Sequence, residues 1–87
     1  MNIQIKVLSR EISEYLWRTE QTLSTAESCT SGLVAASITS TPGASNYFKG
    51  GVVAYVDEMK TQLLDVPAAL LEEKGAVSPE VAEAMVK

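Results

Sequence analysis

The chain of 87 residues contains no histidine. Histidine is the base in Ser–His and Cys–His catalytic pairs, and it is a ligand in most zinc and non-haem iron sites. Its absence excludes these arrangements. If the protein is a hydrolase, its base must be a lysine, a carboxylate or a tyrosine.

Cysteine occurs once, at Cys29, so the chain cannot form an internal disulfide, which fits a reducing compartment. Residues 1–20 carry charges throughout and lack the apolar segment of a secretory signal. The longest apolar run is far shorter than the ~20 residues that span a bilayer. These observations predict a cytoplasmic protein that does not bind a membrane.

Basic residues are few and are not clustered. The net charge is −4 and the pI is about 4.6. Neutralising a phosphate backbone requires grouped lysine and arginine side chains, so nucleic acid is not an expected partner. With 46% hydrophobic residues, the composition is nevertheless that of an ordinary globular domain, and the length allows one small domain at most.

The hydrophobic pattern predicts helices that alternate with two strands. Ile5, Leu8, Ile12, Tyr15 and Leu16 recur at helical spacing and predict one apolar helix face. Ser78-Pro79 is a typical helix start, and the apolar stripe of the helix that follows consists of Val81, Met85, Ala82 and Val86. The segment 33–38 is apolar on nearly every side, as in a buried helix. In chain order we expect a helix over 3–19, strands over 21–26 and 48–56 separated by a helix over 33–38, and helices over 57–64, over 66–74 and from 79 onward.

This alternation favours the α/β class, and we expect a three-layer α/β/α sandwich. Two strands rarely form a stable sheet alone. We therefore interpret residues 1–87 as one domain that is truncated at its C-terminal side. The chain then covers about the N-terminal half of the complete fold. We also expect the chain to form a homo-oligomer or to associate with the remainder of such a domain.

Ser28 is the first candidate for chemistry. It lies where the first strand meets the next helix, as in a nucleophile elbow, although the G-x-S-x-G pattern is absent. The unpaired N–H groups at a helix start suit an oxyanion. The alternative is structural, because Ser28 or Thr30 could simply cap the helix. The neighbouring Cys29 is a rival nucleophile, but without histidine or an adjacent cation we expect a small buried cysteine.

Lys60 is the candidate base. If Asp57 caps the helix that follows the second strand, Lys60 occupies the third helical position, where glutamate or glutamine is usual. A cation in a first helical turn costs about 0.3–1 kcal/mol, and residues that break local rules often mark functional sites. The spacing also leaves open a lysine extended into solvent. Tyr55, at the end of the second strand, is placed to assist Lys60.

Residues 25–32, T-A-E-S-C-T-S-G, resemble the T-A-E-S-C-T-G-G signature of the CinA C-terminal domain family. Further matches in the family's order and spacing are Pro42-Gly43-Ala44-Ser45, Tyr47-Phe48, Gly51-Val52-Val53-Ala54-Tyr55, Lys60, Leu64-Asp65-Val66 and Gly75-Ala76-Val77-Ser78.

The resemblance implies an amidohydrolase that converts nicotinamide mononucleotide into nicotinic acid mononucleotide and ammonia, without a metal or organic cofactor. It implies Ser28 as the nucleophile, Lys60 as its base and Tyr55 as the assisting residue. We expect Lys60 Nζ within hydrogen-bond reach of Ser28 Oγ, or one water away. Candidate oxyanion donors are the backbone N–H groups of Thr30, Ser31 and Gly32.

Two departures from the family pattern support other interpretations. Ser31 replaces a glycine, which would strain the chain if that position requires a positive φ. The chain also has about half the length of family domains. A truncated or degenerate relative that binds a pyridine nucleotide or a protein without turnover is therefore the alternative function. A plain oligomerisation module is the third.

Overall fold

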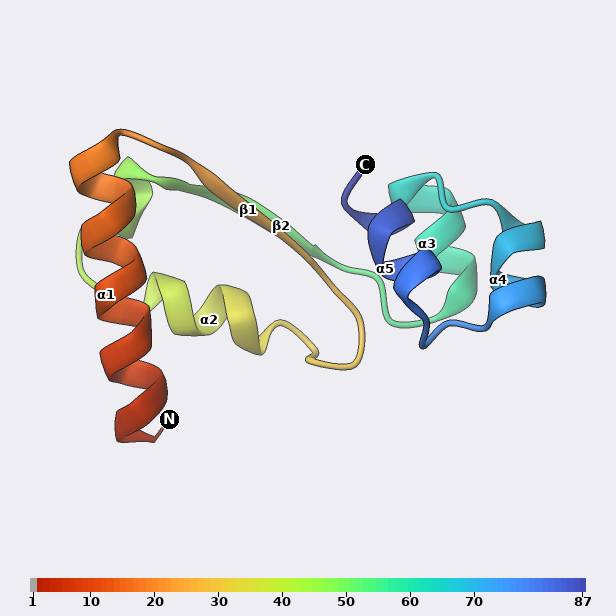
Figure 1. Cartoon of the computed structure of the whole chain (residues 1–87), viewed down its shortest axis with the longest axis horizontal. Helices are drawn as coiled ribbons and strands as arrows, with labels where there is room; N and C mark the ends of the chain where they lie inside the picture. Colours follow the sequence, from red (N-terminus) through yellow and green to blue (C-terminus); the bar gives the residue numbers. More distant parts are fainter. Residues whose placement is uncertain (1) are drawn as a thin grey trace. The chain divides into compact units, whose positions relative to one another are not determined.

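A computed structural model describes residues 2–87 of the chain (Figure 1). The elements, in order, are α1 (Ile3–Thr19), β1 (Leu23–Glu27), α2 (Leu33–Thr39), the 3-10 helix η1 (Ala44–Asn46), β2 (Phe48–Val53), α3 (Asp57–Leu64), α4 (Ala68–Lys74) and α5 (Pro79–Met85). None of the helices among the described residues is long and apolar enough to cross a membrane.

The strands β1 and β2 are hydrogen-bonded neighbours and run parallel. Leu23 N–H donates to the Tyr47 carbonyl at 2.8 Å near the start of the pair, and Ala54 N–H donates to the Glu27 carbonyl at 2.8 Å at its end. Parallel strands require a crossover between them, and α2 lies in that crossover. The α/β class predicted from the sequence is confirmed.

The described chain divides into two compact units. The first contains the residues up to Thr25 together with Gly32–Gly51, and the second contains Ala26–Ser31 together with Val52–Lys87. The first unit has a core formed by Leu16, Ile38, Ala44 and Tyr47. The second has a core formed by Val66, Leu71, Val81 and Met85, where α3, α4 and α5 pack on one another.

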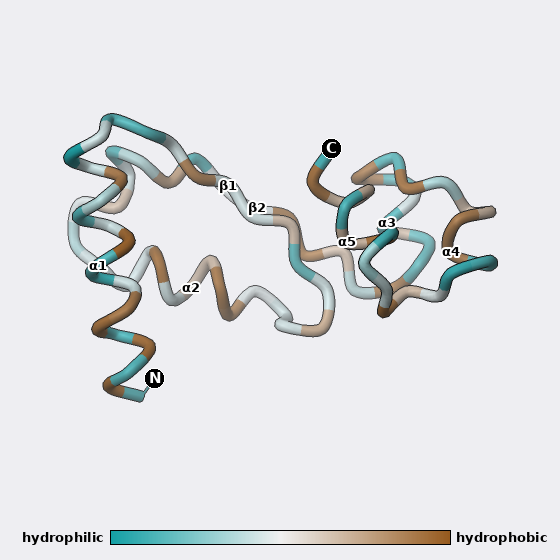
Figure 2. The backbone as a smooth tube through the Cα atoms, viewed as in Figure 1, coloured by the Kyte–Doolittle hydropathy of each residue, from teal (hydrophilic) through white to brown (hydrophobic). Residues whose placement is uncertain are grey.

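The face that α1 buries differs from the predicted one. Apolar residues recur along the helix (Figure 2), but Leu8, Ile12 and Tyr15 are exposed, whereas Ser9, Ser13 and Leu16 are buried. α1 packs against α2, and small side chains allow two helices to approach closely. The Ser13 hydroxyl donates to the Ser9 carbonyl at 2.7 Å, so this hydroxyl is satisfied within its own helix.

Two other helices also differ from expectation. In α2 only Ser37 and Ile38 are buried, so the described residues do not supply the partners that its apolar sides predict. In α5 the predicted Ser78 cap is confirmed, because its hydroxyl accepts from Val81 N–H at 3.3 Å. Val81 is buried as predicted, but Val86 at the end of the same stripe is exposed.

The boundaries of β2 and α3 matter for the candidate site. β2 ends at Val53, three residues earlier than predicted, so Tyr55 lies in the connection to α3 rather than in the strand. α3 begins at Asp57 as a first helical residue, and its N-cap is Val56. Lys60 is therefore the fourth residue of α3 and not the third.

Gly51 allows β2 to lie close to β1. A Cβ at this position would collide with the Thr25 hydroxyl oxygen and would lie 3.3 Å from the Thr25 carbonyl oxygen. The Thr25 hydroxyl is itself buried, and none of the described residues accepts or donates a hydrogen bond to it. The strand pair therefore depends on a glycine opposite this threonine.

Replacing Gly51 with alanine should lower the free energy of unfolding by about 1–3 kcal/mol, because overpacking of a closely paired site forces the strands to shift. Urea unfolding of the full chain measures this loss. In a Thr25→Ala background the same change should cost clearly less, because the colliding hydroxyl is gone. An equal cost in both backgrounds would show that Thr25 is not the constraint.

Candidate active site at the carboxyl end of the strand pair

Ser28 follows directly after the last residue of β1. The final interstrand bond joins the Glu27 carbonyl to Ala54 N–H, so Ser28 and Tyr55 are the next residues along two paired chain segments. Ligands in open α/β sheets bind outside the carboxyl ends of parallel strands. The pairing therefore places Ser28 and the Tyr55 backbone at the edge where such a site is expected.

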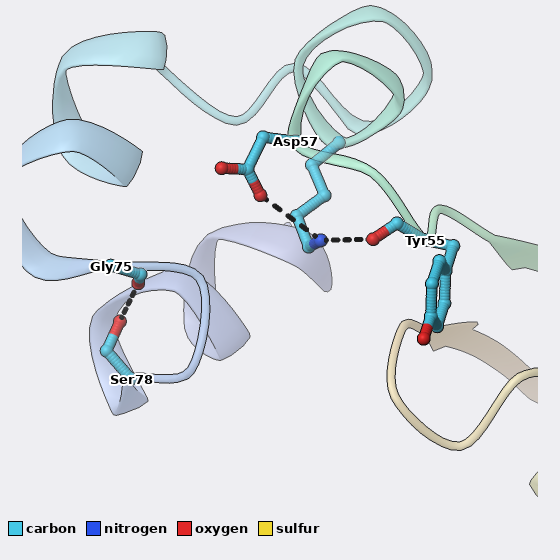
Figure 3. Close-up of polar contacts among 5 residues, drawn as sticks. Tyr55, Asp57, Gly75 and Ser78 are labelled. Atoms are coloured by element: carbon cyan, nitrogen blue, oxygen red, sulfur yellow. Dashed lines mark hydrogen bonds and ion pairs between the residues drawn. The ribbon is translucent and has the colours of Figure 1, made fainter.

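Lys60 is one of the most buried side chains of the described residues, with 1% of its surface exposed. Its Nζ donates a hydrogen bond of 3.0 Å to the Tyr55 carbonyl oxygen and lies 3.5 Å from Asp57 Oδ1 (Figure 3). The alternative of a lysine extended into solvent is therefore wrong. Burying an ammonium group requires polar partners, and the Tyr55 carbonyl and the Asp57 carboxylate supply them.

A short series of backbone contacts joins the three candidates. Ser28 is linked through the Glu27 carbonyl to Ala54, and Tyr55 follows Ala54 and holds Lys60. Residues 2–87 contain no direct hydrogen bond between Ser28 Oγ and Lys60 Nζ. Catalytic contacts are often long before substrate binds. The contact through one water stays a prediction.

Tyr55 contacts Lys60 through its backbone carbonyl. Its side chain is 64% exposed, and Figure 3 shows the ring directed away from the Lys60 amine, on the side opposite the carbonyl that accepts from it. Substitutions of the tyrosine ring therefore leave the carbonyl contact to Lys60 in place. The assisting role of the hydroxyl stays a prediction.

The turn after β1 is tied together by two short contacts. Thr30 Oγ1 donates to Glu27 Oε1 at 2.7 Å, and Ser31 N–H donates to the Ser28 carbonyl at 3.0 Å. The N-cap of α2 is Gly32, with no side-chain cap bond. The structural alternative, in which Ser28 or Thr30 caps this helix, is therefore wrong. The oxyanion role of the Thr30, Ser31 and Gly32 backbone stays a prediction.

Ser28, Cys29 and Thr30 line an open cavity of ≈ 560 Å³. The opposite wall comes from α5 and the segment before it, mainly Ala76, Val77, Ala82, Met85 and Val86. This volume lies within the range of small-molecule sites, which are mostly apolar with a few polar groups. The sequence analysis did not predict this wall, although Ala82 and Val86 belong to the predicted apolar stripe of α5 and indicated an apolar surface there.

Cys29 is exposed and free, so the prediction of a buried cysteine is wrong. The Thr30 contact to Glu27 and the preceding strand end fix the turn, which carries the thiol outward. No group of three or more His, Cys, Asp and Glu side chains that could hold a metal ion occurs in the part of the chain that the structure describes. The cavity offers hydroxyls and one thiol, and neither Lys60 nor Tyr55 is among the residues that line it.

Ser31 adopts a left-handed conformation with a φ of 56°, next to Gly32 with a φ of 93°. From the sequence we expected strain at Ser31 if this position requires a positive φ, and the φ is positive. A residue with a Cβ in this region is strained by roughly 1–2 kcal/mol, whereas glycine is not. Ser31 therefore stores strain two peptide bonds beyond Cys29, in the turn that carries the candidate nucleophile.

The fold and the cavity define an α/β domain with a hydroxyl-lined site at the carboxyl end of parallel strands. Residues 5–87 match the model of the CinA C-terminal domain, so the chain belongs to the CinA C-terminal domain family. A CinA-like protein of Desulfotalea psychrophila is 54% identical over 78 residues, which are 90% of this chain and 19% of that protein. One from Geotalea uraniireducens is 67% identical over 64 residues, 74% of this chain and 15% of that protein.

Solved structures agree with this assignment. The competence/damage inducible protein CihA from Agrobacterium tumefaciens superposes with a TM-score of 0.94 at 35% identity, covering 98% of this chain and 52% of that one. A CinA superfamily protein from Escherichia coli gives 0.90 at 31% identity, covering 98% and 51%. The chain thus spans about half of these solved chains and about a fifth of the length of the first relative.

Replacing Ser31 with glycine should make the protein more stable than replacing it with alanine, by about 1 kcal/mol. Both changes remove the hydroxyl, so their difference reports only the cost of a Cβ at positive φ. Urea unfolding of the two variants measures it. At an ordinary helical position the order is reversed, with alanine favoured by roughly 0.5–1 kcal/mol. That reversed order at position 31 would contradict the left-handed conformation.

Proposed function

We propose that this chain belongs to an amidohydrolase that cleaves the carboxamide of nicotinamide mononucleotide, giving nicotinic acid mononucleotide and ammonia in the cytoplasm. The observation that carries the proposal is the buried Lys60 amine, held by the Tyr55 carbonyl beside the strand end from which Ser28 emerges. Membership of the CinA C-terminal domain family and the intact Ser28, Tyr55 and Lys60 support it.

In the proposed reaction, Ser28 Oγ attacks the amide carbon and the Lys60 amine takes the hydroxyl proton. The backbone N–H groups of Thr30 and Gly32 stabilise the oxyanion, because the Ser31 N–H already donates to the Ser28 carbonyl. Lys60 returns the proton to the departing ammonia, and water then hydrolyses the acyl-serine ester in the same way. The apolar wall formed by Ala82, Met85 and Val86 is suited to the pyridine ring, because a flat ring gains from apolar contact.

The position of Lys60 explains why a lysine serves as the base. Its stem is buried, so the amine has few alternative positions, and Asp57 and the Tyr55 carbonyl restrict it further. A rearrangement that moves Nζ toward Ser28 Oγ exchanges one hydrogen bond for another. Tyr55 has two separable roles in this scheme, a backbone role that positions Lys60 and a hydroxyl role that assists proton transfer.

The second candidate function is binding of a pyridine nucleotide, or of a protein, without turnover. The strained Ser31 favours it, because the family glycine is replaced in the turn that must approach the substrate. Calorimetry with nicotinamide mononucleotide distinguishes the two functions. Heat of binding without ammonia release supports the second function, and ammonia release supports the first.

We also propose that the chain associates with a second copy of itself or with a further polypeptide segment. Leu8, Ile12 and Tyr15 form an exposed apolar stripe on α1, and Val77 in the second unit is 93% exposed. Exposed apolar patches of this kind mark interaction surfaces. A two-stranded sheet also leaves unpaired edges.

Ser28→Ala and Lys60→Met should each reduce ammonia release from nicotinamide mononucleotide by roughly a hundredfold or more, because each removes a group that acts in proton transfer or attack. Lys60→Met keeps the buried stem, so its urea midpoint should stay near that of the unmodified chain. Lys60→Arg should be nearly as harmful, since arginine cannot act as a neutral base.

Cys29→Ala is the matched control for Ser28→Ala and should retain activity, because the thiol is adjacent but has no assigned role. Tyr55→Phe keeps the carbonyl that holds Lys60, so any loss of activity reports the hydroxyl alone. A dead Cys29→Ala variant combined with an active Ser28→Ala variant would assign the nucleophile to the thiol and refute the proposed mechanism.

Light scattering across a dilution series should show a mass above that of one chain, because the exposed apolar stripe and open strand edges favour association. Leu8→Lys on the stripe should shift the series toward smaller species, while Lys6→Gln on the same helix should not. A monodisperse 9.3 kDa monomer that unfolds cooperatively at low micromolar concentration would contradict self-association.

A further inference from the structure

The first unit contains a second cavity that the proposed reaction does not use. It has a volume of ≈ 470 Å³ and lies between α1 and the segment 41–47. Its walls include Arg10, Glu14, Trp17, Arg18 and Tyr47, none of which lines the cavity beside Ser28. Its volume falls within the range of sites that bind small molecules.

Two arginines without a salt bridge among the described residues, Arg10 and Arg18, line this cavity. The chain carries a net charge of −4, yet neither Arg10 nor Arg18 forms a salt bridge among residues 2–87. The Arg18 guanidinium lies 5.9 Å from the centre of the Tyr15 ring, a contact that leaves its N–H donors available. Guanidinium groups bind carboxylate and phosphate oxygens through paired N–H donors, so the cavity is suited to an anion.

Trp17 supplies a flat apolar surface beside these cations. It is 58% exposed, and one edge of its ring lies against Gly43, where an added Cβ would be 3.7 Å from Trp17 Cζ3. More than half of the Trp17 surface is therefore uncovered. Aromatic rings, and the bases of nucleotides in particular, stack on such a surface.

Two further polar residues line the cavity. Tyr47 is 2% exposed and belongs to the core of the first unit, and its buried hydroxyl has no hydrogen-bond partner in the described chain. Glu14 is the acidic residue among those that line the cavity. Its carboxylate accepts hydrogen bonds and is therefore suited to an exocyclic amine on a ring.

We propose that this cavity binds a nucleoside monophosphate with an amino-substituted base. Arg10 and Arg18 bind the phosphate, the base stacks on Trp17, and Glu14 accepts from the amine. The site is separate from the proposed amidase reaction, because its residues and its ligand are different. Loss of amidase activity therefore leaves this proposal standing, and the converse also holds.

Trp17 is the single tryptophan of the sequence, so its fluorescence reports on this cavity. The full chain is titrated with adenosine 5′-monophosphate, with adenosine and with inorganic phosphate in separate arms. A saturable change with the monophosphate is expected, with adenosine and phosphate each binding at least about tenfold more weakly, because each lacks one of the two contacts. Equal responses to phosphate and to the monophosphate would overturn the stacking role of Trp17.

Arg10→Gln and Arg18→Gln should each weaken binding by roughly tenfold to a hundredfold, the usual loss for a charge-assisted hydrogen bond. Lys6→Gln removes the same charge from α1 outside the cavity and should leave the affinity within about twofold, since exposed charges act weakly at a distance. Ser28→Ala should not change the affinity. No saturable response at millimolar ligand, or equal losses in the Lys6 and arginine variants, would overturn the site.

Discussion

The hydrogen bond from Ala54 N–H to the Glu27 carbonyl is the contact on which the candidate site depends. It closes the parallel pairing of β1 and β2, and it fixes where both chain segments leave the sheet. The turn with Ser28 begins on one side of this bond, and the carbonyl that holds Lys60 follows on the other side. The parallel pairing thus brings the Glu27 and Ala54 peptide groups together, and Ser28 and Tyr55 are the residues that follow them in the chain.

The buried lysine is the second constraint, and it illustrates how far the sequence could lead. Helix position alone singled out Lys60 as a cation near the start of a helix. The end of α3 at Leu64 was predicted correctly, whereas its N-cap is Val56 and not Asp57. Its burial was not predictable, because a lysine has the same spacing whether its stem packs inward or extends outward. The hydrogen bond to the Tyr55 carbonyl holds the Lys60 side chain in its buried position. The position of that carbonyl depends on where β2 ends. The residues Val52–Val56 mostly favour β-structure, so the sequence does not indicate at which of them the strand ends.

The errors in predicting buried faces have a common physical cause. Hydrophobic periodicity identified α1 and correctly predicted a buried Leu16, but it also assigned Leu8, Ile12 and Tyr15 to the buried face, where the structure buries Ser9 and Ser13 instead. Hydrophobic periodicity reflects the free energy of transferring side chains out of water, but close packing of two helices also depends on side-chain size. In α5 the apolar stripe was predicted correctly, but the sequence did not show what its residues face. Ala82 and Val86 line a cavity and do not belong to a core. A pattern of apolar residues does not distinguish these two environments.

Ser31 connects the strand end to the chemistry of the turn. Its left-handed backbone is unfavourable for any residue with a Cβ, and such strain persists only where surrounding contacts fix the conformation. Here the Ser31 N–H bond to Ser28 and the Thr30 bond to the buried Glu27 provide those contacts. A turn without a geometric requirement would relax into an ordinary conformation. The hydrogen bonds of this turn therefore hold Ser31 in a conformation that a residue with a Cβ does not favour by itself.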